Sequence, residues 1–143
     1  MIDREADARW EGDLRGGRGT IRLGSGAFEG KYSFSSRFEG SPGTNPEELI
    51  GAAHAGCFTM ALTSGLTKAG HPPKTIETTA TVHLDKVEAG FGITGIDLAT
   101  TGEVPGIDAA EFQRLAEDAK KNCPVSRALA SVTIRLQATL RGA

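Results

Sequence analysis

The sequence predicts an α+β fold, in which segments with strand periodicity stand on both sides of two helical segments. Residues 76–85 and 132–140 alternate apolar with polar side chains, as strands with one buried face do. Residues 46–68 and 109–121 are flanked by helix start and stop signals. Because strands and helices do not alternate along the chain, we expect antiparallel sheets around two main helices.

The first third of the chain is typical of β-hairpins. Residues 6–11 alternate small or apolar with charged side chains, and a glycine-rich turn at residues 16–19 leads into the next strand. Tyr32, Phe34 and Phe38 predict a further strand, since aromatic residues favour strands.

A long helix is expected from Pro46 to about Lys68. Asn45 suits the N-cap, proline suits the first helical position, and the two glutamates that follow favour the positive end of the helix dipole. Gly70 is the expected stop. Residues 49–67 contain no Asp, Glu, Lys or Arg. A helix without charge must be covered on all sides, which is difficult for one chain of 143 residues.

Small residues on this helix point to a second copy of the chain. Ala52 with Gly56, and Ala61 with Gly65, are four apart and would let another backbone approach closely. We therefore infer that the helix lies at the centre of a homodimer. The alternative, in which the chain's own sheet and second helix cover it, stays open. A membrane span is not expected, because His54 and several threonines leave the segment only moderately apolar.

The remaining elements follow from alternation and caps. A strand over residues 91–99 is expected to pair with the preceding strand through a tight turn. Asp108, with Glu111 three residues later, predicts a capping box at the start of the second main helix. Residues 122–124 interrupt that helix, and a short third helix is expected through Leu129.

Composition limits the possible functions. The chain has 143 residues, a mass of 14.9 kDa and a formal net charge of −2. These values fit a single domain, residues 1–143, without the charge expected of a protein that binds nucleic acid or an anionic membrane. The amino terminus is charged and lacks the apolar run of a signal peptide, so we expect a soluble cytoplasmic protein. Two cysteines are too few for a disulfide-dense scaffold or a four-cysteine zinc site.

Cys57 and Cys123 are the candidate reactive residues. Cys57 lies in the middle of the long helix, whereas Cys123 precedes a proline that can begin a helix. As an N-cap, Cys123 would face backbone N–H groups that stabilise a thiolate, which makes it the more acidic thiol on local grounds. Single buried cysteines are mostly inert, and Cys57 would need a cation beside it, from Arg37, Arg18 or a protonated His54.

A metal site is not expected. His54 and Cys57 are one helical turn apart, but His71 and His83 fall in a predicted loop and a predicted strand without matching spacing. His54 is better explained as a core histidine with satisfied hydrogen bonds than as a base. The sequence contains no nucleophile elbow, phosphate loop or dinucleotide fingerprint.

Two segments are specific enough to indicate a family. Residues 37–58 read RFEGSPGTNPEELIGAAHAGCF and residues 122–129 read NCPVSRAL. They resemble the osmotically inducible OsmC family and its relatives, the organic hydroperoxide resistance proteins, and the resemblance extends over nearly the whole chain. It implies a thiol-dependent peroxidase for organic hydroperoxides. It also implies an OsmC-like fold, an intertwined α+β homodimer with active sites at the subunit interface.

The resemblance also implies roles for individual residues. Cys57 matches the peroxidatic cysteine, which forms a sulfenic acid, and Cys123 matches the resolving cysteine, which closes a disulfide with it. Arg37 matches the arginine that activates the thiolate, and Glu47 matches the glutamate that holds this arginine. In the hydroperoxide resistance branch the arginine comes from the glycine-rich turn, so Arg18 stays the alternative. No cofactor is implied; an external thiol or dithiol reductant, with a lipoyl protein among the candidates, would reduce the disulfide.

Helix geometry adds one constraint. Glu47 and Cys57 are ten residues apart on one predicted helix, or about 15 Å along its axis, which is farther than one arginine side chain can bridge. Either the helix breaks between them, or the glutamate serving each Cys57 comes from the partner subunit; we predict the second. The alternative to a peroxidase is a non-catalytic protein on the same fold that senses redox state or binds a small ligand.

Overall fold

The computed structural model describes residues 1–142, which divide into two compact units. The first unit runs from Met1 to Leu49, and the second begins at Ile50. Whether residues 1–143 behave as one domain in solution stays a prediction.

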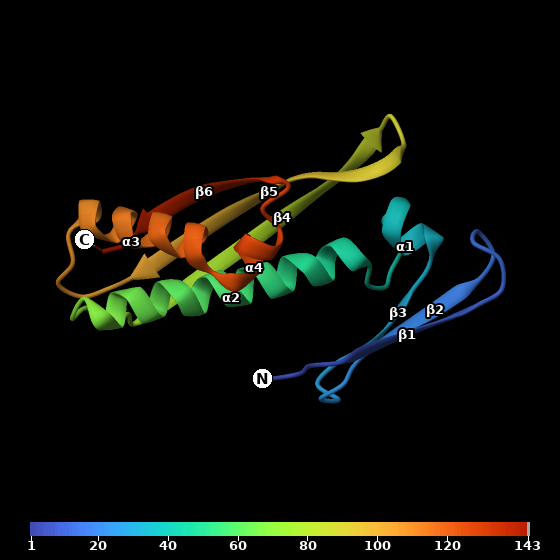
Figure 1. Cartoon of the computed structure of the whole chain (residues 1–143), viewed down its shortest axis with the longest axis horizontal. Helices are drawn as coiled ribbons and strands as arrows, with labels where there is room; N and C mark the ends of the chain where they lie inside the picture. The colour runs from blue at the N-terminus through green and yellow to red at the C-terminus, as the bar shows by residue number, and fades with distance from the viewer. Residues whose placement is uncertain (143) are drawn as a thin grey trace. The chain divides into compact units, whose positions relative to one another are not determined.

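The first unit begins with a three-stranded antiparallel sheet. The strands follow one another in chain order and are joined by two hairpins, as the sequence predicts (Figure 1). They are β1 (Ala6–Glu11), β2 (Arg18–Leu23) and β3 (Glu29–Tyr32).

The segment Phe34–Phe38 is a helix, α1, and the strand prediction for it is wrong. The Ser33 hydroxyl accepts a hydrogen bond from the Ser36 backbone N–H at 3.0 Å, and the Ser36 hydroxyl accepts one from the Ser33 N–H at 2.8 Å. This reciprocal capping box starts a helical turn. The two phenylalanine rings then lie one turn apart, with centroids separated by 4.9 Å. The capping serines outweigh the strand tendency of the aromatic residues.

The long helix α2 (Pro46–Lys68) has the predicted bounds and is continuous. The Asn45 side chain accepts a hydrogen bond from the Glu48 N–H at 2.8 Å, and Gly70 ends the helix with a φ of 86°. By length and composition alone α2 could cross a membrane, a test that the core helix of a soluble protein also passes.

The second unit packs α2 and two further helices against a three-stranded sheet (Figure 1). The predicted strands and helices of this unit are all present; the first two strands extend beyond the predicted 76–85 and 91–99, whereas the last begins one residue inside the predicted 132–140. In chain order the elements after α2 are β4 (Thr75–Val87), β5 (Gly90–Glu103), α3 (Ala109–Asn122), α4 (Pro124–Ala128) and β6 (Thr133–Leu140). The core between sheet and helices is apolar and includes Phe58, Leu62, Leu66, Ile96, Leu98, Phe112, Leu115 and Ala116.

The prediction of a purely antiparallel sheet is wrong for one strand of this sheet. β4 and β5 form the expected antiparallel hairpin, but β6 pairs with β5 in parallel. Parallel neighbours need a long crossover connection, which α3 and α4 supply. The α+β class is confirmed and the sheet is mixed, because apolar alternation marks a buried face without fixing strand direction.

The start of α3 is only partly as predicted. Asp108 caps the helix by accepting a hydrogen bond from the Glu111 N–H at 2.8 Å. The Glu111 carboxylate, however, pairs with Arg114 at 2.8 Å. Within residues 1–142 the second half of the capping box is therefore not formed, because the arginine one turn away competes for the carboxylate.

The two pairs of small residues on α2 have different surroundings. A Cβ built on Gly65 would lie 3.7 Å from Leu115 of α3, so this part of α2 faces the chain's own second helix. Ala52 and Gly56 are exposed, and Met60 on the next turn is 76% exposed. One apolar strip of α2 thus stays uncovered by the chain itself.

Candidate active site

The predicted site residues form two pairs. Arg37 and Glu47 meet in the first unit, and Cys57 and Cys123 meet in the second. Each pair is held by local structure that the sequence specifies.

Arg37 and Glu47 form a tight ion pair. The Arg37 Nη2 lies 2.7 Å from the Glu47 Oε1, and the Arg37 Nε lies 3.1 and 3.2 Å from the two carboxylate oxygens. The Glu47 side chain is only 10% exposed, whereas that of Arg37 is 38% exposed. Fixed on one edge by Glu47, the guanidinium keeps Nη1 available for another acceptor.

Hydrogen bonds within the loop that follows α1 position this ion pair. The Ser36 hydroxyl donates to the Thr44 carbonyl at 2.8 Å, and the Asn45 side-chain amide donates to the Ser36 carbonyl at 3.3 Å. These bonds tie the end of α1 to the start of α2. Arg37, in the last turn of α1, therefore faces Glu47, in the first turn of α2.

Arg18, the alternative to Arg37, has a different environment. It lies at the start of β2, where its guanidinium is 3.3 Å from the Glu11 carboxylate. Its side chain is 84% exposed. Solvent screens such a pair, so Arg18 is held much less firmly than Arg37.

Cys57 and Cys123 are free thiols within hydrogen-bonding contact of each other. Cys57 lies in the middle of α2, and Cys123 is the N-cap of α4, as the sequence predicts. The Cys123 sulfur accepts a hydrogen bond from the Ser126 backbone N–H at 3.3 Å. Residues 66 positions apart are thus brought together by the contact between α2 and α4.

The two thiols are shifted in opposite directions. Burial raises the pKa of Cys57, and the contact with Cys123 raises it further, against a hydrogen bond from the backbone of Val125. Burial also raises the pKa of Cys123, but hydrogen bonds from the Ser126 side chain and backbone and from Cys57 outweigh it and lower the pKa overall. Cys123 is therefore the more acidic thiol, in agreement with its position at a helix start. No cation among residues 1–142 contributes to the pKa of Cys57.

His54 is buried beside the cysteine pair. Its Nε2 lies 2.7 Å from the Ser126 hydroxyl, and its Nδ1 has no hydrogen-bond partner within the described part of the chain. The prediction of a satisfied core histidine is correct for one ring nitrogen only. Burial lowers the pKa of His54, which favours the neutral imidazole over a cation that could activate Cys57.

Ser126 is a site residue that sequence reasoning missed. It follows Cys123 by three residues in the segment Cys-Pro-Val-Ser, so the spacing places it on the same face one helical turn later. That spacing was the available signal, although a serine in the first turn of a helix is common enough to escape notice.

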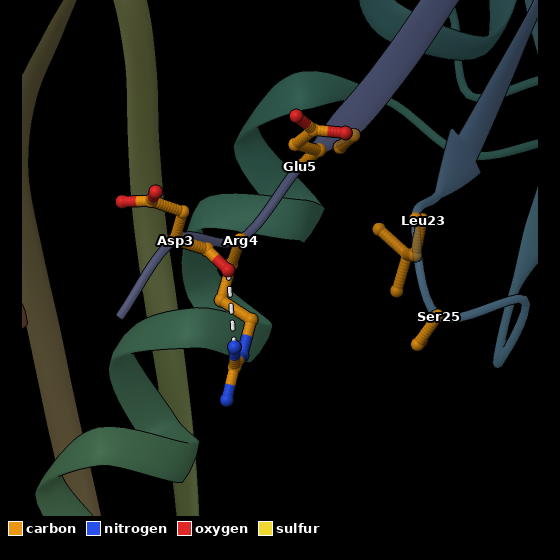
Figure 2. Close-up of a pocket in the computed structure, with 7 residues that line it drawn as sticks. Asp3, Arg4, Glu5, Leu23 and Ser25 are labelled. Carbon is orange, nitrogen blue, oxygen red and sulfur yellow. Dashed lines mark hydrogen bonds between the residues drawn. The ribbon is translucent and has the colours of Figure 1, made fainter. Parts of the chain in front are cut away.

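Two pockets in the first unit differ in chemistry. One lies beside the segment before β1 and has the charged residues Asp3, Arg4 and Glu5 in its wall (Figure 2). The other has a volume of about 430 Å³ and is mainly apolar, with Arg37 in its wall. Its lining consists of Trp10, Gly12, Leu14, Tyr32, Ser33, Phe34, Arg37 and Phe38. Phe38 is thus a pocket residue, whereas Phe58 belongs to the core and Met60 lies on the surface.

No group of three or more His, Cys, Asp or Glu side chains within residues 1–142 is arranged to hold a metal ion. The contact of two free thiols, one of them a helix cap, defines a cysteine-based redox site on an α+β scaffold.

Comparison with known proteins places this site in a family. A family model described as OsmC-like protein matches residues 38–137. Peroxiredoxin OsmC of Escherichia coli is 52% identical over 138 residues, which cover 95% of this chain and 96% of the relative. The organic hydroperoxide resistance protein of Xanthomonas axonopodis is 36% identical over 90 residues, covering 62% of this chain and 61% of the relative. The chain belongs to the OsmC family and is a cysteine-based, thiol-dependent peroxidase.

Solved structures agree with this assignment. The organic hydroperoxide resistance protein of Elizabethkingia anophelis is 27% identical, with a TM-score of 0.74, and the match covers 98% of this chain and 96% of that one. The organic hydroperoxide resistance protein OhrB of Bacillus subtilis is 26% identical, with a TM-score of 0.72, and the match covers 96% of this chain and 98% of the OhrB chain. The OsmC-like fold is confirmed.

Proposed function

We propose that the protein reduces organic hydroperoxides to alcohols, with Cys57 as the peroxidatic and Cys123 as the resolving cysteine. The observation that carries this proposal is the direct contact between the two thiols. A sulfenic acid on Cys57 would form within reach of a second sulfur, so a disulfide could close without a large movement. The names of relatives, a peroxiredoxin and organic hydroperoxide resistance proteins, support the same chemistry.

The first step is a nucleophilic displacement at oxygen. The Cys57 thiolate attacks the terminal oxygen of the hydroperoxide, an S–O bond forms and the O–O bond breaks. The alkoxide leaves and takes up a proton to become the alcohol. The sulfur is oxidised to the sulfenic acid by the two electrons that the peroxide gains.

Activation of Cys57 requires a positive charge, and no residue of the described part of the chain, 1–142, supplies one to its thiol. We assign this charge to Arg37, because Glu47 fixes its guanidinium while leaving Nη1 available for an anion. An adjacent cation would lower the pKa of Cys57 and bind the negative charge that develops on oxygen. Arg18 is the weaker candidate, since its side chain is 84% exposed.

We further propose that the Arg37–Glu47 pair of one chain serves Cys57 of a second chain. α2 is continuous from Pro46 to Lys68, so no break shortens the helical rise between Glu47 and Cys57. The exposed strip of α2 formed by Ala52, Gly56 and Met60 offers a surface for the partner. The apolar pocket beside Arg37 fits the carbon chain of an organic substrate.

An external thiol or dithiol would reduce the disulfide and complete the cycle. A lipoyl protein is one candidate of suitable chemistry. The cytoplasm is the expected compartment, because its reducing environment keeps both cysteines as thiols between turnovers.

Mass analysis after addition of one molar equivalent of cumene hydroperoxide tests the cysteine assignment. The wild type should yield cumyl alcohol and a Cys57–Cys123 disulfide. Cys123→Ser should yield the alcohol and a Cys57 sulfenic acid, whereas Cys57→Ser should yield neither. If Cys57→Ser consumes hydroperoxide as fast as the wild type, the proposal is wrong.

A charge on the exposed strip of α2 tests the dimer. Met60→Asp should convert the protein to monomers in sedimentation analysis and reduce peroxide turnover with it, because a buried unpaired carboxylate opposes association. Lys68→Asp, a charge change at the solvated end of the same helix, is the control and should leave the sedimentation unchanged. A fully active monomer would refute the shared site.

A further inference from the structure

His54 and Ser126 form a buried hydrogen-bonded connection to Cys123 that the proposed roles leave unused. The His54 Nε2 lies 2.7 Å from the Ser126 Oγ, which in turn lies 3.3 Å from the Cys123 Sγ. His54 and Cys123 are completely buried, and Ser126 is 4% exposed. These polar groups are shielded from solvent, so they depend on one another for their hydrogen bonds.

The unpartnered nitrogen of His54 sets the direction of this connection. A neutral imidazole carries one N–H, and a buried N–H without an acceptor is rarer than a buried lone pair without a donor. Because Nδ1 has no partner among residues 1–142, we assign the proton to Nε2. His54 then donates to the Ser126 oxygen, and the hydroxyl proton of Ser126 is free to point at the Cys123 sulfur.

As a neutral thiol, Cys123 donates to the Ser126 hydroxyl oxygen at 3.3 Å and accepts from the Ser126 backbone N–H at 3.3 Å. Once the thiol is ionised, the proton direction set by His54 lets the Ser126 hydroxyl donate as well, so the sulfur faces two donors from one residue. Two donors without a competing acceptor favour the charged form of the acceptor. The lowered pKa of Cys123 is consistent with this geometry.

Four side chains make the contact between α2 and α4 at this point. His54 and Cys57 are one turn apart on α2, and Cys123 and Ser126 are one turn apart on α4. The His54–Ser126 bond and the Cys57–Cys123 contact therefore join the same two helices, one helical turn apart. Cys57 and Cys123 are the titratable groups that face this bond, and no charged side chain of the described residues contributes to the pKa of His54.

We propose that His54 and Ser126 are positioning residues for the resolving step, which hold the Cys123 sulfur as a thiolate directed at Cys57. The inference rests on the proposed function, because it presupposes a sulfenic acid on Cys57. In that step the Cys123 thiolate attacks the Cys57 sulfur, an S–S bond forms and the S–O bond breaks. The hydroxide that leaves takes a proton from solvent and becomes water. Cys123 is oxidised and the sulfenic sulfur is reduced, so no further oxidant is needed.

A purely structural role explains the arrangement less well. A leucine at position 54 would fill a similar volume without burying an unpartnered nitrogen, which destabilises a core. The histidine is accounted for when its task is to orient the Ser126 hydroxyl.

The first test uses no peroxide and is independent of the proposed function. In a Cys57→Ser background, the ultraviolet absorbance of the Cys123 thiolate is followed against pH. Ser126→Ala and His54→Leu should both raise the apparent pKa of Cys123, and His54→Gln, whose amide can donate to Ser126, should restore part of the shift. Thr100→Val is the matched control, because it removes a buried hydroxyl that bonds to Thr78 and leaves the Cys123 neighbourhood untouched.

The second test separates the two chemical steps. Each variant with both cysteines receives one equivalent of cumene hydroperoxide, and the sulfenic acid is trapped with dimedone at successive times. Ser126→Ala should form the disulfide at least about tenfold more slowly, which is the loss expected for one hydrogen bond to a charged group, and should change the rate of Cys57 oxidation by much less. Dimedone adduct on Cys57 should increase accordingly.

The outcomes distinguish this inference from the proposed function. If the wild type forms no sulfenic acid, the proposed function fails, while the pH titration still decides the role of His54 and Ser126. If Ser126→Ala leaves both the Cys123 titration and the rate of disulfide formation unchanged, the inference is overturned. Should His54→Leu not fold, Ser126→Ala and His54→Gln test the same connection with smaller changes.

Discussion

Two arginine–carboxylate pairs in this protein have similar distances and opposite surroundings. Arg37 binds Glu47 at 2.7 Å, where the carboxylate side chain is 10% exposed. Arg135 binds Asp97 at 2.6 Å across β5 and β6, and His83 binds the same carboxylate at 2.7 Å. The side chains of this second cluster are 41–63% exposed. The shorter contact thus lies in solvent, and the longer one lies in a protected site.

The difference shows that burial and not distance decides what an ion pair can do. Solvent screens an exposed pair, and its free energy is small even at ideal distance. A protected carboxylate that loses its partner is left desolvated, so the same chemical change there is costly. Glu47 can therefore hold the Arg37 guanidinium in one orientation, whereas the exposed Arg135–Asp97 pair is held only weakly.

The largest effect is expected on removing the protected carboxylate charge. Glu47→Gln should reduce peroxide turnover by about 100-fold, because Arg37 loses its fixed orientation and its counter-charge. Glu48→Gln is the matched control, since it removes the same charge from the same helical turn. The Glu48 carboxylate accepts a hydrogen bond from the Thr44 hydroxyl and does not bind Arg37. Steady-state turnover of cumene hydroperoxide measures both. Equal losses in the two variants would assign the effect to the helix start in general.

A smaller effect is expected on replacing the guanidinium and keeping its charge. Arg37→Lys should lower turnover by about tenfold, because an ammonium cannot make the forked contact with Glu47. Arg18→Lys, at the exposed pair with Glu11, should change turnover by less than about twofold. Stopped-flow measurement of the first oxidation step separates them. The reverse order would transfer the activating role to Arg18.

The smallest effect is expected at the surface cluster. Hydrogen bonds from Arg135 and from His83 lower the pKa of Asp97. In the unfolded chain Asp97 has an ordinary pKa and therefore binds more protons than in the folded protein. Asp97 thus stabilises the folded protein fully above the ordinary aspartate pKa, and this stabilisation is lost as the pH falls through the lowered pKa of the folded state.

Asp97→Asn should therefore leave turnover unchanged and lower the urea midpoint slightly at neutral pH. The difference from the wild type should vanish in strong acid. A growing difference on acidification would mean that the sign of the linkage is wrong.

Local signals made much of the site predictable. The proline after Cys123 marked it as a helix cap, and the asparagine and proline before Glu47 marked the start of α2. Both features depend on residues adjacent in the sequence, so one sequence is enough to predict them. The expected contact of Arg37 with Glu47 came from the family resemblance, and the structure supplies its geometry.

The parts of the site and the fold that the sequence did not predict depend on contacts between distant segments. His54 and Ser126 are 72 residues apart, and only the packing of α2 against α4 brings them together. The parallel direction of β6 likewise depends on the path of the crossover helices, and strand alternation carries no information about it. In the segment Phe34–Phe38, two serines form a capping box that competes with a strand-like aromatic pattern, and the serines decide the outcome.

The position of Cys123 at the start of α4 has a further consequence for the oxidised protein. The same sulfur that would enter the disulfide also accepts the Ser126 N–H bond that begins the helix. A disulfide sulfur carries no charge and is a weaker acceptor, so bond formation removes part of the cap. The first turn of α4 should then fray when the protein is oxidised. The amide proton of Ser126 should exchange with solvent faster in that state, so a cycle through the proposed disulfide would loosen and then restore one short helix.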